Sequence, residues 1–298
     1  MKTATIAIVG RPGAGKSTLL NSLTGRKVSI TAAVPQTTRN KIRGILTEER
    51  GQLIFIDTPG WYDSRKKFNL RMQDLVSAAL AETDMALYVN DGGRPAGPEE
   101  EAIVAQLAAS GRPVVAAVNK SDIASPRREE NAAFIRLRLA RAALVSVSAV
   151  TGSGLDELKT LLFSLAPEGP PLYPPEFYTD QEPEFRVAEI IREKAIAVSR
   201  EELPHALYVD VADLETREGT GKGAENANQL WIRAFIVVET ESQKGILVGA
   251  GGSRIKAIRV AAQKELGKIF PYRIQLDLRV KARPRWRRED NLLKRLIR

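Results

Sequence analysis

The chain has 298 residues, of which 43% are hydrophobic and 27% charged, a globular composition that argues against a disordered or collagen-like chain and allows two domains. It contains no cysteine, so disulfides, thiolate metal sites and cysteine nucleophiles are excluded, and a reducing cytoplasm is the expected location. The net charge of +9 is concentrated at one end, since residues 242–298 hold 16 Lys and Arg against 4 Asp and Glu. Such a basic end suits phosphodiester backbones or anionic lipid, with a merely solubilising surface as the alternative.

The beginning of the chain, MKTATIAIVG, is typical of a strand rather than of a secretion signal. No apolar run approaches the roughly 18 residues that span a bilayer. We therefore expect neither export nor a transmembrane segment.

Residues 167–175 read PEGPPLYPP, with five prolines in nine positions. This composition excludes a helix or a central strand and favours an extended connection. The sequence thus predicts a first domain over residues 1–168, a linker over 169–177 and a second domain over 178–298.

In the first part, apolar strand-like runs alternate with helix-like segments. The runs are TATIAIV, LIFI, MALYV, PVVAAV and ALVSVS, and the helix-like segments include residues 16–24, 70–81 and 154–165. This alternation predicts an α/β domain with crossover units around a mainly parallel sheet.

After the linker the order of elements changes, which predicts a smaller α+β domain rather than a duplication. The expected elements are a helix over residues 181–199, strands over 206–214 and 230–239, a short turn to 248, a helix over 253–266 and a strand over 273–282. The Gly- and Asn-rich stretch 217–229 predicts a hairpin loop between the first two strands.

The most specific motif is GRPGAGKS at residues 10–17, which matches the phosphate-loop pattern GxxxxGK[ST] directly after the first apolar run. Glycines leave room for backbone N–H groups to face phosphate oxygens, and a helix N-terminus favours anions. Lys16 would neutralise the β- and γ-phosphates, and the Ser17 hydroxyl would ligate Mg²⁺. The alternative is a glycine-rich turn with a surface lysine. We assign nucleotide binding here to Gly10, Arg11, Pro12, Gly13, Ala14, Gly15, Lys16, Ser17 and Thr18.

The sequence DTPG closes the run LIFI, at the end of a strand where open α/β sheets bind nucleotides. Asp57 would hold Mg²⁺ through water, and the N–H of Gly60 would contact the γ-phosphate because glycine allows close approach. DTPG alone is also a common turn after a strand. The expected nucleotide-binding residues are Asp57, Thr58, Pro59 and Gly60.

Recognition of the base is predicted at NKSD, after the run PVVAAV. The carboxylate of Asp122 can accept hydrogen bonds from guanine N1–H and N2–H₂, whereas adenine offers neither donor. Asn119 would tie this loop to the phosphate loop, and the stem of Lys120 would cover the base and ribose. A polar turn or helix cap is the alternative. The segment Ser148-Ala149-Val150 would complete the pocket through the Ala149 N–H and guanine O6.

The motifs GRPGAGKS, PQTTR, DTPG, NKSD and SAV, in this order, resemble those of the GTPase domain of the Era family. The resemblance to the family covers nearly the whole chain. The resemblance implies a P-loop GTPase domain that uses GTP, GDP and Mg²⁺, followed by a type II KH domain. It implies that Lys16, Thr38 and Gly60 serve hydrolysis, with Thr38, or alternatively Thr37, as a second hydroxyl on Mg²⁺.

The second part carries a matching signature, VGAGG followed by the helical pattern SRIKAIRVAAQKEL. A side-chain-poor loop lets a sugar–phosphate backbone approach a helix N-terminus, whereas GAGG alone could simply start a helix. Trp286 could stack on a base, or the end of the chain could pack on the KH domain through Leu292, Leu293, Leu296 and Ile297. The predicted RNA-binding residues are Gly249, Ala250, Gly251, Gly252, Arg254, Lys256, Arg259, Arg285 and Trp286.

The resemblance implies a GTP-hydrolysing switch that binds small-subunit ribosomal RNA near its 3′ end and assists assembly of the small ribosomal subunit. We expect a cytoplasmic monomer, with weak peripheral contact at the inner face of the membrane. The alternatives are a membrane-associated regulatory GTPase, a GTPase acting on a different RNA, or an ATP-using phosphotransferase on the same phosphate loop.

Two positions depart from related GTPases. Gly13 stands where the family commonly has an Asn, which in related GTPases helps to hold potassium, so potassium stimulation is not expected. Trp61 stands where Ras-like proteins place a water-orienting Gln. We therefore expect slow unassisted hydrolysis, on the order of 10⁻⁴ to 10⁻² s⁻¹.

Asp122→Asn is expected to weaken the preference for guanine over adenine nucleotides by about two orders of magnitude, because the amide cannot accept both base hydrogen bonds. Competition between GTP and ATP for the wild-type and variant proteins measures this. If ATP displaced GTP from the wild-type protein at comparable concentration, the phosphotransferase would be the better interpretation.

Overall fold

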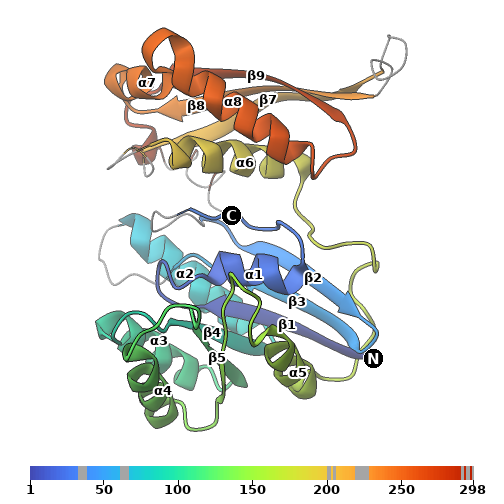
Figure 1. Cartoon of the computed structure of the whole chain (residues 1–298), viewed down its shortest axis with the longest axis vertical. Helices are drawn as coiled ribbons and strands as arrows, with labels where there is room; N and C mark the ends of the chain where they lie inside the picture. Colours follow the sequence, from blue (N-terminus) through green and yellow to red (C-terminus); the bar gives the residue numbers. More distant parts are fainter. Residues whose placement is uncertain are drawn as a thin grey trace. The chain divides into compact units, whose positions relative to one another are not determined.

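The computed structural model describes residues 1–32, 39–60, 67–199, 203, 206–218, 228–289, 292 and 296, without the side chains of 67–72 and 288. The chain divides into two compact units, the first ending at Asp180 and the second running from Gln181 to Arg298 (Figure 1). Within the described residues, no helix combines the length and apolar character that crossing a bilayer requires.

The first unit contains a six-stranded sheet in the order β2-β3-β1-β4-β5-β6. All neighbours are parallel except β2, which is antiparallel to β3, so the predicted mainly parallel sheet is confirmed. The strands are β1 Lys2–Val9, β2 Ile42–Glu48, β3 Gly51–Asp57, β4 Met85–Asp91, β5 Val114–Asn119 and β6 Ala143–Ser146. The edge strand β2 lacks a long apolar run and was not predicted.

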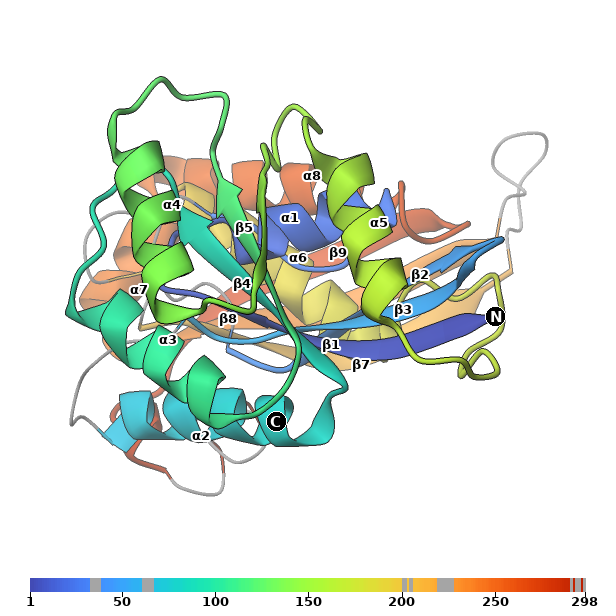
Figure 2. The ribbon, with the colours of Figure 1, turned by 90° about the horizontal axis from the view of Figure 1, so that it is seen from below.

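Helices cover both faces of this sheet, with α2, α3 and α4 on one face and α1 and α5 on the other (Figure 2). They are α1 Lys16–Thr24, α2 Lys67–Glu82, α3 Pro98–Ala109, α4 Arg127–Arg138 and α5 Leu155–Leu165. Because β1, β3, β4, β5 and β6 run in one direction, their carboxyl ends meet at one edge. The loops that carry the nucleotide motifs all leave from that edge.

The predicted linker packs on the first unit. The side chain of Gln52 accepts hydrogen bonds from the N–H groups of Leu172 and Tyr173 at 2.8 and 2.9 Å, and Ile45 N–H donates to the Tyr178 carbonyl at 3.0 Å. These bonds hold the proline-rich segment against β2 and β3. The second unit begins at Gln181, close to the predicted start of the second domain at residue 178.

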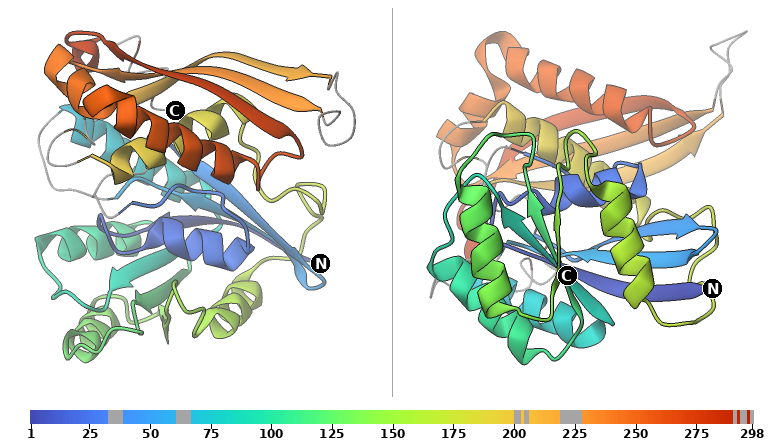
Figure 3. Two further views of the ribbon diagram at one scale, coloured as in Figure 1. Left: turned by 45° about the horizontal axis from the view of Figure 1, so that its top comes forward. Right: turned by 60° about the horizontal axis from the view of Figure 1, so that its bottom comes forward.

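The second unit is a three-stranded sheet, β7-β8-β9, against which α6, α7 and α8 pack (Figure 3). Strands β7 and β8 are antiparallel, whereas β8 and β9 are parallel. The elements are α6 Pro183–Ala197, β7 Tyr208–Arg217, β8 Gln229–Val238, α7 Glu241–Val248, α8 Ser253–Leu266 and β9 Arg273–Ala282. The pairing of Arg217 with Gln229 confirms the hairpin, and most of the predicted 217–229 loop lies outside the described residues.

The expected turn before residue 248 is wrong, because that segment is the helix α7. Thr240 caps it: Gln243 N–H donates to Thr240 Oγ1, and Gln243 Oε1 accepts from Thr240 N–H, both at 3.2 Å. This is a capping box, in which two otherwise unpaired N–H groups are satisfied. The pattern Thr-x-x-Gln at 240–243 was the signal for this helix.

Candidate functional site

The phosphate loop joins β1 to α1 and depends on glycine. Gly13 and Gly15 have φ of 77° and 93°, in the left-handed region that side chains rarely adopt. At Gly15 the Asn119 side chain occupies the space that a Cβ would need. The loop conformation therefore leaves the N-terminus of α1 open to an anion.

Lys16 lies folded under this loop, with 6% of its surface exposed. Its Nζ donates to the carbonyls of Gly10 and Arg11 at 2.9 and 3.1 Å. Burial lowers the pKa of Lys16 to about 8, and the charge of Asp57 partly opposes that shift. A buried ammonium group of this kind gains from a polyanionic ligand that would neutralise it.

Asp57, at the end of β3, is completely buried. One carboxylate oxygen accepts hydrogen bonds from the hydroxyls of Ser17 at 2.7 Å and Ser29 at 2.9 Å. Oxygen donors of this type suit Mg²⁺, which is commonly held by few protein groups together with phosphates and water. The residues therefore fit the implied metal. The sequence did not indicate Ser29, because no motif marks the loop after α1.

Among the residues that the structure describes, no group of three His, Cys, Asp or Glu side chains gathers as a metal cage. Gly60 faces the same loop, since an added Cβ would lie 2.8 Å from the N and Cα atoms of Pro12. Thr37, Thr38 and Trp61 lie outside the described residues.

The Asn119 side chain connects the loops. Its Nδ2 donates to the Ala14 carbonyl at 2.9 Å, and its Oδ1 accepts from Ala149 N–H at 3.0 Å. The bond to the phosphate loop is the one that the sequence predicted. A single buried amide side chain therefore fixes the position of the phosphate loop relative to the SAV segment.

Asp122 is exposed at the rim of the site, where the Ser148 hydroxyl donates to it at 2.6 Å. That hydrogen bond is the main cause that lowers the pKa of Asp122, so the side chain is a carboxylate at neutral pH. Ala149 is 4% exposed and Val150 is 78% exposed. The structure therefore gathers Asn119, Asp122 and Ala149 around one loop junction, in an arrangement suited to a guanine base.

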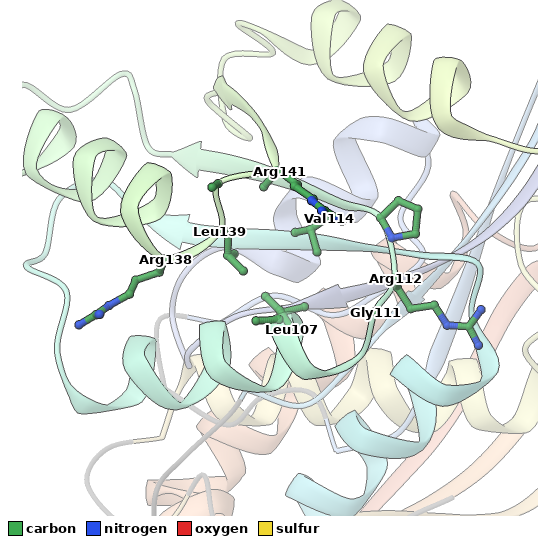
Figure 4. A pocket seen from close by; sticks show the side chains of 11 residues that line it. Leu107, Gly111, Arg112, Val114, Arg138, Leu139 and Arg141 are labelled. Atoms are coloured by element: carbon green, nitrogen blue, oxygen red, sulfur yellow. The ribbon is translucent and has the colours of Figure 1, made fainter.

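A separate cavity of about 500 Å³ lies at the opposite edge of the sheet, where β5 begins (Figure 4). It is lined by apolar side chains including Leu107, Val114 and Leu139, and Figure 4 shows Arg112 and Arg138 pointing away from them. It contains none of the nucleotide motif residues.

In the second unit, the GxxG loop lies between α7 and α8. Gly249, Gly251 and Gly252 all have positive φ, of 72°, 57° and 78°, and no heavy atom described by the structure lies within 4 Å of a Cβ added to Gly251 or Gly252. The loop is thus open in front of the N-terminus of α8, which a phosphate group can approach.

The basic side chains near this loop differ in role. Arg254 packs against Gly249 and donates to the Ile246 carbonyl at 3.0 Å, so it also holds the loop in place. Lys256 and Arg259 are exposed on α8, and Arg285 is exposed near the end of the chain. These three remain predicted phosphate contacts.

Trp286 is buried in the second unit, contrary to the predicted role in stacking on RNA. Only 2% of its surface is exposed, its ring packs edge-on against Tyr208 with centroids 4.8 Å apart, and its Nε1 donates to the Ala206 carbonyl at 3.2 Å. It shares a buried cluster with Val237 and Leu292. The prediction that Trp286 stacks on RNA is therefore wrong for this structure. The alternative packing of the chain end is observed for Leu292 and Leu296, whereas Leu293 and Ile297 lie outside the described residues.

Comparison with known protein families gives two matches. The model described as "50S ribosome-binding GTPase" matches residues 5–120, and the KH domain model matches residues 202–287. A curated relative named GTPase Era from Treponema denticola is 44% identical over 299 residues, covering 99% of both chains. GTPase Era from Borreliella burgdorferi strain B31 is also 44% identical and covers all of both chains.

Two solved structures are similar over the full chain. Aquifex aeolicus Era, as a variant bound to GDP.AlF4⁻, has 34% identity and a TM-score of 0.91, covering 100% of this chain and 99% of that one. Era in complex with MgGDPNP and nucleotides 1506–1542 of 16S ribosomal RNA has 35% identity and a TM-score of 0.91, covering 100% and 98%. These matches confirm the P-loop GTPase fold and the KH domain.

The depressed pKa of Lys16 predicts a pH-dependent affinity for GDP. Above about pH 8 the empty site loses the Lys16 proton, whereas bound phosphate keeps the ammonium charged, so binding takes up a proton. Affinity should fall by up to about tenfold per pH unit above 8 and stay flat below 7. Titration calorimetry in buffers of different ionisation enthalpy measures the uptake.

The stability of the empty protein should change in the opposite direction. The unfolded chain keeps the Lys16 proton up to its ordinary pKa of 10.5, so unfolding binds a proton between pH 8 and 10.5 and stability rises with pH there. A GDP affinity that did not change between pH 7 and 9 would contradict the buried ammonium.

Trp286→Ala should lower the free energy of unfolding by about 3–5 kcal/mol, because it removes a buried ring. Trp286→Phe should cost less and leave RNA affinity unchanged. Urea unfolding and RNA titration measure the two quantities, with the exposed Arg285→Ala as the control for stability. Loss of RNA affinity in Trp286→Phe at unchanged stability would restore the stacking role.

Proposed function

This chain belongs to the Era family of GTPases and hydrolyses GTP, and we propose that its second unit binds the 3′ end of small-subunit ribosomal RNA during assembly of that subunit. The observation that supports this most directly is the open GxxG loop at the N-terminus of α8, with exposed Lys256 and Arg259 behind it. A solved relative carries RNA of this kind.

We assign nucleotide binding in the first unit to the loops at the carboxyl edge of the sheet. Mg²⁺, when bound, would neutralise negative charge on the phosphates. Ser17 and Asp57 would hold it, Lys16 would pair with the phosphates, and the Gly60 N–H would lie near the γ-phosphate. With Trp61 in place of a water-orienting Gln, positioning of the attacking water is incomplete, so hydrolysis is slow.

RNA recognition would combine two kinds of contact. The loop glycines allow backbone N–H groups to approach the sugar–phosphate chain, and the basic side chains add a charge term that depends on salt. Some basic side chains near the C-terminal end already form ion pairs within the second unit, since Arg287 donates to Glu239 and Arg283 donates to Glu289. The proposed phosphate contacts are therefore the loop, Lys256 and Arg259 on α8, and the exposed Arg285.

Peripheral contact with anionic membrane and a monomeric state belong to this proposal as well. Lipid would be attracted by charge alone, without need of the glycine loop. A variant that changes the loop and leaves the basic residues in place therefore separates RNA from lipid.

Gly251→Asp is the sharpest test, because it places a negative charge on the loop, and Asp tolerates the left-handed backbone better than most residues. Affinity for a single-stranded RNA with the 3′-terminal sequence of the small-subunit RNA should fall more than about tenfold. Anionic vesicle binding should change little. If Gly251→Asp left the RNA affinity unchanged, the GxxG loop would not be the RNA contact.

Lys256→Gln and Arg259→Gln should each weaken RNA binding severalfold and reduce the logarithmic salt slope by about 0.7. Lys264→Gln, at the far end of the same helix, is the matched control and should change neither. Fluorescence anisotropy over a salt series measures both. An affinity independent of salt would contradict phosphate contacts on α8.

The glycine at position 13 predicts how GTP hydrolysis responds to potassium and sodium ions. Wild-type GTP hydrolysis should be equal in potassium and sodium, since Gly13 offers no side-chain ligand. Gly13→Asn should fit, because a Cβ there meets no described heavy atom within 4 Å and Asn tolerates positive φ. If the added amide holds potassium, the variant alone becomes faster in potassium. Stimulation of the wild type would show that Gly13 does not decide this property.

A further inference from the structure

A cluster of buried charges joins the phosphate loop to the base-recognition loop, outside any of the sequence motifs except at Arg11 and Lys120. Arg11 is 7% exposed, and its two carboxylate neighbours, Asp91 and Glu100, are each 1% exposed. Asp91 ends β4, and Glu100 lies in the first turn of α3. Burying charges is costly, so their arrangement must satisfy them.

Arg11 is held mainly by Glu100. The Arg11 Nε lies 3.0 Å from Glu100 Oε1, and Nη1 donates to Glu100 Oε2 at 3.3 Å and to the Pro95 carbonyl at 3.2 Å. Its remaining nitrogen, Nη2, lies 3.9 Å from Asp91 Oδ2. Arg11 is therefore neutralised by Glu100 and only approached by Asp91.

The close partner of Asp91 is Lys120. Asp91 Oδ2 accepts from Lys120 Nζ at 2.8 Å, and Oδ1 accepts from Gly93 N–H at 3.0 Å. The exposed guanidinium of Arg94 lies 3.8 Å from the same Oδ2, and the Asp91 carbonyl accepts from Asn131 at 3.2 Å. This carboxylate is thus fixed in place, whereas the Lys120 side chain is 31% exposed and flexible by nature.

We propose that Asp91 is a positioning residue of the nucleotide site, which tethers the ammonium of Lys120 so that the lysine stem lies ready over the base and ribose. Lys120 has a left-handed backbone, with φ of 65°, which fixes where its stem begins, and Asp91 fixes where it ends. A stem ordered before binding loses less entropy when the nucleotide arrives. The inference rests on the proposed contact of Lys120 with the nucleotide.

Asp91 also faces the phosphate loop, because its carboxylate lies 3.9 Å from the Arg11 guanidinium. The carbonyl of Arg11 in turn accepts a hydrogen bond from Lys16 at 3.1 Å. One carboxylate therefore faces a side chain from each of the two loops that the nucleotide bridges. Since Glu100 already neutralises Arg11, loss of Asp91 should affect Lys120 first.

The test compares Asp91→Asn with wild type, using fluorescent methylanthraniloyl GDP and the corresponding IDP, which lacks the guanine 2-amino group. The variant should bind both about tenfold more weakly, as expected for loss of one charge-assisted bond. The ratio of GDP to IDP affinity should be unchanged, because Asp122 reads the 2-amino group. Asp84→Asn, just before the other end of β4, is the matched control.

Lys120 variants separate the tether from the stem. Lys120→Met keeps a stem of similar length without the charge, and should lose about as much GDP affinity as Asp91→Asn. In the Lys120→Met background, Asp91→Asn should have no further effect. The positioning role would be overturned if the losses of GDP affinity in the two single variants added up in the double variant. It would also be overturned if Lys120→Met bound GDP as tightly as the wild-type protein.

Lys120→Ala removes the stem and tests the underlying assignment separately. If Lys120→Ala weakens GDP binding and Asp91→Asn does not, only the tether is wrong. If neither has an effect while GDP still binds, Lys120 does not cover the nucleotide and both assignments fall. Failure of the wild-type protein to bind GDP at all would instead contradict the GTPase function.

Discussion

The first unit is organised around a buried ammonium group. Lys16 is folded under the phosphate loop and bonded to the carbonyls of Gly10 and Arg11, with Asp57 as the charge that partly compensates it. Such a group is unfavourable without an anion, so the loop favours the binding of phosphate. The left-handed glycines, the orientation of α1 and the Asn119 bridge all serve to hold the loop around this charge.

The connections between loops explain how binding of one nucleotide can involve distant segments of sequence. Asn119 holds Ala14 and Ala149, and Thr58 donates from the end of β3 to the Ile8 carbonyl of β1 at 2.7 Å. Each is a buried hydrogen bond between strand ends that meet at one edge. Buried polar groups of this kind are costly when unpaired, which favours a single arrangement of the site.

Much of this site could be predicted because phosphate loops and base-recognition loops are local patterns. Helix α8 and strand β9 were predicted with their observed bounds, since their apolar periodicity is strong. Ser29, Asp91 and Glu100 could not be found, because their contacts are made with residues far away in the chain and not with neighbouring sequence. Trp286 looked like an exposed ring among arginines, but its partner Tyr208 lies 78 positions earlier in the chain, and only the fold brings them together.

The two units use the same element, a glycine loop before a helix N-terminus, with different electrostatics. Gly15 precedes α1 and Gly252 precedes α8, both in the left-handed conformation. In the first unit the cation is buried beneath the loop, where salt screens it little, whereas around the second loop the basic side chains are exposed and screened. The first loop is therefore suited to a small polyanion bound in one geometry. The second is suited to a long polyanion that binds reversibly and with an affinity that depends on ionic strength.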